Sequence, residues 1–145
     1  MPDMLETRRK KKLVLSCSGA ANVGFLAHRA AVELVEEGFA RPSCLAGIGA
    51  HLKGFLKAAA DSSNIVIDGC AVACGKTILE HASIPVALHL VITDLGIEKK
   101  MTSDIPGEDV DRVKELLQLR WAAAESGKPG RDPFDSGEPP CGCST

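Results

Sequence analysis

The sequence predicts a single α/β domain: a short, mostly parallel, four-stranded sheet in a three-layer arrangement with helices on both faces. Short apolar runs alternate along the chain with segments of helical periodicity, which is typical of a parallel sheet with crossover helices. The chain has 145 residues and 45% apolar residues, enough for one hydrophobic core. Right-handed crossovers and an edge position for the second strand predict the strand order 2-1-3-4.

The first half of the chain begins with a strand over 13–17. A loop of small residues follows, and Asn22 is a candidate cap for a helix that ends at Gly38. A second strand is expected to end near 44–46. Pro42 places this strand at an edge, because proline cannot donate to a ladder.

The second half continues the alternation. Apolar side chains at helical spacing predict a helix around 52–59. The β-branched run over 65–67 predicts a strand buried on both faces, and 86–92 predicts a fourth strand. A last helix is expected from Pro106, with acidic residues in its first turn.

The ends of the chain differ from this domain in composition. Residues 1–12 form a basic segment and residues 127–145 a segment rich in proline and glycine, so we expect two tails around a domain over 13–126. The apolar run after the basic segment is too short for a signal peptide. Cys141 and Cys143 lie in the second tail, where we expect them to be dispensable.

The composition also restricts function. With 17 basic and 19 acidic residues, 3% aromatics and no tyrosine, nothing indicates a nucleic-acid partner. No apolar run is long enough to span a membrane. Six cysteines are too few for a secreted disulfide scaffold of this length, which indicates a cytoplasmic protein using its cysteines for metal or thiol chemistry.

The central stretch carries two of these cysteines. Asp68-Gly69 ends the third strand, and Cys70 and Cys74 follow four residues apart. If a helix begins at Cys70, both sulfurs lie on one face near its N-terminus, where thiolate is favoured. That spacing suits a shared metal ion better than a direct disulfide. The alternative is that both cysteines are ordinary core residues.

Two further cysteines are expected at the same end of the sheet. Cys17 ends the first strand and Cys44 follows the second, while Cys70 and Cys74 follow the third. Ligands of open α/β sheets bind beyond the carboxyl ends of the strands, where the strand order reverses. Four thiolates complete a tetrahedral zinc shell, so the sequence predicts a zinc ion as the partner of these four residues; an iron–sulfur cluster is the less favoured variant.

A family resemblance rests on short motifs spread over about 13–100. They are Cys17-Ser18-Gly19, Asn22-Val23-Gly24, Ser43-Cys44-Leu45-Ala46-Gly47-Ile48, Ile67-Asp68-Gly69-Cys70 with Cys74, and Thr93-Asp94-Leu95-Gly96-Ile97. In these the chain resembles the DGC domain family, named for its central Asp-Gly-Cys. The resemblance implies that Cys17, Cys44, Cys70 and Cys74 are zinc ligands. It implies no biochemical role beyond that.

The main functional hypothesis is a zinc-binding protein that acts in metal handling or sensing. Two other interpretations compete with it. In a thiol-dependent redox or sulfur-transfer enzyme, Cys70 would be the nucleophile, with Cys74 or Cys17 resolving it. A phosphate-binding loop over 70–77 is the weaker alternative, because Cys70 occupies the position of its first glycine. We expect Asp68 to cap the helix that follows it, and His89 to be a partnered core residue.

Overall fold

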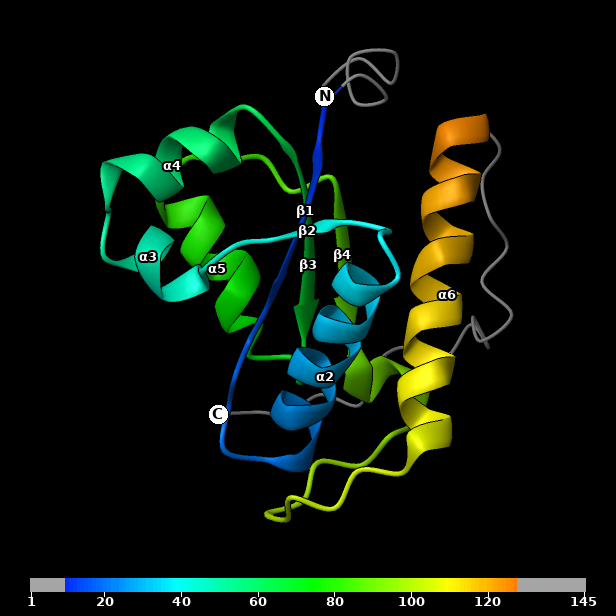
Figure 1. Cartoon of the computed structure of the whole chain (residues 1–145). Coiled ribbons are helices and arrows are strands. Elements are labelled where there is room, and N and C mark those ends of the chain that lie inside the picture. The colour runs from blue at the N-terminus through cyan, green and yellow to red at the C-terminus, as the bar shows by residue number, and fades with distance from the viewer. Residues whose placement is uncertain (1–9, 128–145) are drawn as a thin grey trace.

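The computed structural model describes residues 10–127 and has one sheet between two layers of helices (Figure 1). The strands are β1 (Lys12–Ser16), β2 (Arg41–Pro42), β3 (Ser63–Asp68) and β4 (Leu88–Val91). They lie in the order β2-β1-β3-β4, and every neighbouring pair is parallel. The predicted α/β class, the strand order and the edge position of Pro42 are confirmed.

The helices divide between the two faces of the sheet (Figure 1). They are α2 (Asn22–Glu36), α3 (Leu45–Gly49), α4 (Lys53–Ala60), α5 (Cys74–His81), the 3₁₀ turn η1 (Ile92–Leu95) and α6 (Gly107–Ser126). One core forms where α2 and α6 cover Ile65 and Ile67, and a second forms where Val66 faces α3, α4 and α5. Side chains alternate across a strand, so β3 supplies both cores. All six of its residues are buried.

The second strand is shorter than predicted, and the helix after it was missed. β2 covers only Arg41–Pro42, and residues 45 and 46, which we expected at the end of the strand, begin α3. Cys44 explains the change, because its Sγ accepts the N–H of Gly47 at 3.4 Å and so caps the first turn of α3. The fourth strand is also shorter than the predicted 86–92, since Ile92 begins η1.

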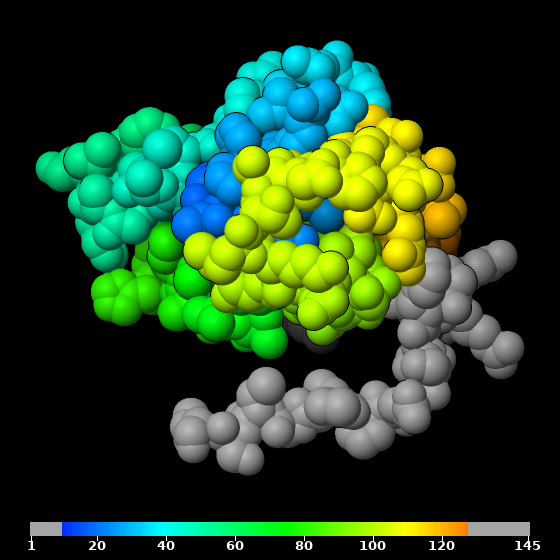
Figure 2. Space-filling view, turned by 90° about the horizontal axis from the view of Figure 1, so that it is seen from below, coloured from blue at the N-terminus to red at the C-terminus, as the bar shows by residue number. Residues whose placement is uncertain are grey.

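Asn22 does not cap α2 as predicted, because Ala21 occupies the cap position. The Asn22 side chain instead accepts the N–H of Lys100 at 2.7 Å and donates to the carbonyl of Glu98 at 2.9 Å. The connection over 96–106 is therefore bound to the start of α2. Seen from below, this yellow-green connection crosses the molecule beside the blue β1–α2 loop (Figure 2).

The two predicted tails lie mostly outside the described residues. Their division from the domain at 12/13 and 126/127, and the role of Cys141 and Cys143, therefore stay predictions. Between residues 10 and 127, no helix combines the length and the apolar character needed to cross a bilayer. The last helix begins at Gly107, next to the predicted Pro106.

Gly69 lets the end of β3 approach the start of α2. A Cβ at Gly69 would lie 2.8 Å from the carbonyl carbon of Val23 and 2.9 Å from the nitrogen of Gly24. Both are backbone atoms, which cannot move aside as a flexible side chain can. The glycine of the Asp-Gly-Cys motif is thus required by packing.

We predict that Gly69→Ala destabilises the protein by about 1–3 kcal/mol, because the added methyl group overpacks this contact. Gly54→Ala is the matched control, since a Cβ at Gly54 would meet no atom of another segment within 4 Å and α4 gains a better helix former. The control should be neutral or more stable. Urea unfolding of both variants measures the difference, and equal stabilities would contradict the packing argument.

Candidate functional site

Cys17 lies directly after β1 and is half-buried. Its Sγ accepts the N–H of Gly69 at 3.1 Å, and its own N–H donates to the carbonyl of Ile67 at 3.1 Å. Burial raises the pKa of the Cys17 thiol, and the nearby Asp68 and Cys70 raise it further, although hydrogen bonds from the Gly69 and Gly19 backbone oppose them. Cys17 therefore lies at the contact between the ends of β1 and β3.

Cys70 is not on a helix, so the predicted one-face pairing of Cys70 and Cys74 is wrong. The N–H of Ala73 donates to the carbonyl of Cys70 at 3.0 Å, which closes a turn, and α5 begins only at Cys74. Ala73 has a φ of 52°, in the left-handed region. The helical spacing that argued against a direct disulfide between Cys70 and Cys74 is absent, and that argument no longer holds.

Asp68 determines where α5 begins. Its side chain is 1% exposed and accepts the N–H groups of Gly75 at 2.8 Å and Lys76 at 3.1 Å. These are two of the N–H groups that the first turn of a helix leaves without a partner. The predicted capping role is confirmed, but the cap acts across the turn that holds Cys70, which is why the helix starts four residues late.

His89 completes the environment of Asp68. Its Nε2 lies 2.8 Å from Asp68 Oδ2, and its side chain is 20% exposed. His89 is thus a partnered histidine, as predicted. In the sheet register, His89 of β4 pairs with Val66 of β3. Asp68 lies two residues further along β3 and on the same face of the sheet, within reach of the imidazole.

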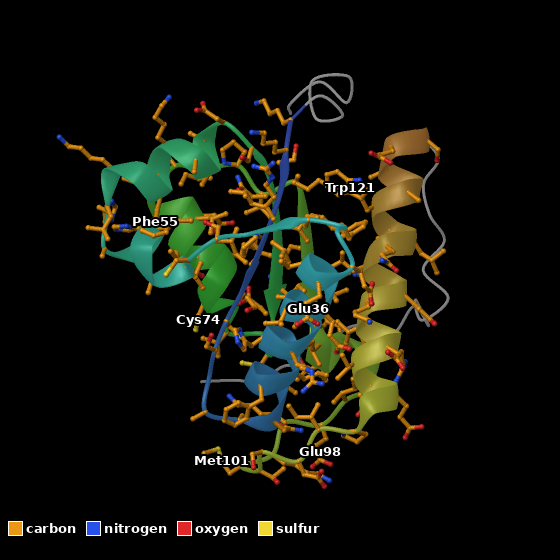
Figure 3. All side chains as sticks on the ribbon, viewed as in Figure 1. Glu36, Phe55, Cys74, Glu98, Met101 and Trp121 are labelled. Atoms are coloured by element: carbon orange, nitrogen blue, oxygen red, sulfur yellow. The ribbon has the colours of Figure 1, made fainter. Side chains whose placement is uncertain are left out.

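Three of the four cysteines line one cavity of about 540 Å³. Cys17, Cys70 and Cys74 contribute thiols, and most of the remaining wall is small or apolar. Figure 3 shows Cys74 at the start of α5 and Met101 on the 96–106 connection, and both residues line this cavity. Cys44 lines a neighbouring cavity of about 380 Å³, and Leu45 and Ala46 line both. Three of the four predicted metal ligands therefore line one cavity, and the fourth, Cys44, lines the cavity next to it.

The thiols are not arranged as a closed coordination shell. Within residues 10–127, no three side chains of His, Cys, Asp or Glu lie close enough to hold a metal ion. Four cysteine thiolates are a common ligand set for zinc in proteins. Cys44 and Cys74 are exposed, so a metal ion can reach them. The residues therefore fit zinc by type, but metal binding requires the loops that carry them to move closer together.

Lys99 was missed by the sequence reasoning. Its Nζ lies 3.6 Å from Cys70 Sγ, and it lines the same cavity. The Asn22 hydrogen bonds to Glu98 and Lys100 hold the backbone on both sides of it. The two residues are 29 positions apart, and no sequence periodicity connects them, so the contact depends on how the 96–106 connection folds back.

The fold and the site define a parallel α/β domain with cysteine thiols beyond the carboxyl ends of its strands. The chain belongs to the DGC domain family, whose model matches residues 13–117, including all four of these cysteines. A relative from Pseudomonas aeruginosa, named anaerobic and virulence modulator AnvM, is 32% identical over 117 residues, which cover 80% of this chain and 88% of the relative. No solved structure gives a significant match.

We predict that Asp68→Ala destabilises the protein by about 2–4 kcal/mol, because it leaves two helix N–H groups and His89 without their acceptor. Asp61→Ala is the control, since Asp61 is an exposed carboxylate whose ion pair with Lys57 lies on the surface. The control should change stability by less than about 0.5 kcal/mol. Chemical denaturation measures both, and a small loss for Asp68→Ala would show that the cap is not needed.

We predict that Cys17 is alkylated more slowly than the exposed Cys44 and Cys74 in metal-free protein. The thiolate is the reacting form, and a raised pKa lowers its fraction at neutral pH. The rate at Cys17 should keep rising above about pH 8.5, the range of an ordinary thiol. Timed iodoacetamide labelling with mass mapping measures the order, and fast labelling of Cys17 at about pH 7 would contradict it.

Proposed function

We propose that the protein binds a metal ion, most favourably zinc, through the thiolates of Cys17, Cys44, Cys70 and Cys74, and acts in metal handling or sensing. The observation that carries this proposal is the shared cavity of Cys17, Cys70 and Cys74, with Cys44 one cavity away. Thiolates from three loops can surround one ion at about 2.3 Å per Zn–S bond. An iron–sulfur cluster uses the same donors and is the less favoured cargo.

Binding would close the site around the ion. Cys44 caps α3, a helix of five residues, and Cys70 lies in the turn before α5, so both thiols sit on short segments rather than in the middle of long elements. Closure of this kind couples metal binding to local folding. Such a coupling suits a sensor, and the name of the Pseudomonas relative describes an anaerobic and virulence modulator.

A second candidate is a thiol-dependent redox or sulfur-transfer enzyme with Cys70 as nucleophile. Lys99 favours it, because its Nζ lies 3.6 Å from the Cys70 sulfur and so places a positive charge beside the candidate nucleophile. The cavity beside Cys70 also has room for a small substrate. In this role Cys74 or Cys17 would resolve the intermediate, and Lys99→Met should slow the reaction of Cys70 with electrophiles.

We predict one tightly bound zinc ion per chain after purification without added metal. Cys70→Ser and Cys74→Ser should each lower metal affinity and thermal stability together, because a ligand is lost from a site whose formation is coupled to folding. Elemental analysis with thiol titration measures this. If elemental analysis finds metal, a colourless protein indicates zinc, whereas visible absorption indicates iron and sulfur.

The double variant Cys141→Ser/Cys143→Ser is the control, and it should keep its metal if the four-cysteine assignment is complete. Loss of metal in this control would assign ligands to the C-terminal segment. A fully folded, metal-free protein that titrates six free thiols would contradict metal binding and favour the enzyme.

A further inference from the structure

A pair of histidines lies away from the cysteines, on the helical layer formed by α3, α4 and α5. His51 follows α3 and His81 ends α5, and their ring centres are 5.5 Å apart with an angle of 73° between the ring planes. Both residues are exposed. Neither lines the cysteine cavity.

The separation of the rings suits two ligands of one metal ion. A metal–nitrogen bond of about 2.0–2.1 Å places two imidazole centres roughly 4.5–5.5 Å apart when both bind the same ion, from the 90° angle of octahedral Ni²⁺ to the wider angle of tetrahedral Zn²⁺. The observed separation lies at the upper end of that range. Because both side chains are exposed, rotation of the rings can turn one nitrogen of each toward a common point without disturbing the core.

The backbone conformation at His51 indicates that a histidine at this position has a function. Its φ is 56°, and its N–H and that of Leu52 donate to the carbonyls of Ile48 and Gly47 at 3.0 Å. This is the position at a helix end where glycine is usual. A side chain in the left-handed region costs free energy, and such strain is concentrated at positions that serve a purpose. Here it directs an imidazole toward α5.

We propose that His51 and His81 form a second metal site, for a divalent transition-metal ion that prefers imidazole, such as Ni²⁺ or Zn²⁺. Within residues 10–127, no third His, Cys, Asp or Glu side chain joins the pair to make a larger donor group. Water completes the coordination of the ion, so the site exchanges its metal readily and binds more weakly than four thiolates.

The position of this site links it to the cysteines. Cys44 caps the start of α3 and His51 follows its end, while Cys74 begins α5 and His81 ends it. α3 and α5 lie next to each other (Figure 1), so an ion between the two histidines fixes their ends against each other. This link to the cysteines rests on the proposed function, because it assumes that Cys44 and Cys74, on the two helices that the ion holds together, are zinc ligands.

Titration of the full-length chain with Ni²⁺ alone, followed by the NMR signals of the imidazole rings, tests the site. Paramagnetic Ni²⁺ should broaden His51 and His81 at lower concentrations than it broadens His28, an exposed histidine on α2. The same titration of Cys74→Ser, which leaves the Cys44 cap of α3 in place, should give the same broadening, because the ion does not depend on that exposed thiol. His51→Asn, which keeps a residue tolerant of the left-handed region, and His81→Gln should each weaken Ni²⁺ binding about tenfold or more.

His28→Gln is the matched control and should leave Ni²⁺ binding unchanged. A rise in melting temperature with Ni²⁺ that disappears in His51→Asn and His81→Gln gives a second measurement on the folded variants. Equal broadening of His28 and His51, or unchanged binding in both variants, would overturn the inference. Zinc on the cysteines without Ni²⁺ at the histidines would reject this inference alone, and the reverse result would reject only the proposed function.

Discussion

The hydrogen bonds of the buried Asp68 carboxylate are the interactions on which the arrangement of the site depends. Asp68 ends β3, accepts two N–H groups at the start of α5 and contacts His89 of β4. Because it is 1% exposed, its oxygens are separated from water and must be satisfied by these groups. The turn that carries Cys70 lies between Asp68 and the helix it caps, so its two ends are fixed by one side chain.

Close contacts at three glycines complete this arrangement. Gly69 touches the start of α2, and a Cβ at Gly24 would lie 2.5 Å from the carbonyl oxygen of Gly19. At Gly75, a Cβ would lie 2.8 Å from Asp68 Oδ1. These glycines, of which Gly24 and Gly69 belong to the family motifs, bring the ends of β1, β3, α2 and α5 close enough for cysteines on different segments to line one cavity.

The fold was predictable because its signals are local. The β-branched run over 65–67, the helical spacing around 52–59 and Pro42 each identify an element or its place in the sheet. The start of α5 was not predictable in this way. It is set by the hydrogen bond that the Gly75 N–H donates to Asp68, seven positions earlier, and a propensity argument that begins the helix at Cys70 does not include that bond. Lys99 was missed for the same reason, since its contact with Cys70 depends on tertiary structure.

The central pairing of the sheet has a consequence for how the chain folds. β1 pairs with β3, and partners in this ladder, such as Val14 and Ile65, are 51 residues apart in the sequence. Parallel pairing at such a separation is slow, because a long loop must close before its contacts form. During synthesis, Cys17 and Cys44 therefore leave the ribosome well before β3 can join β1. In that interval neither thiol is surrounded by the packing of the finished sheet, so both are open to oxidation until β3 joins β1.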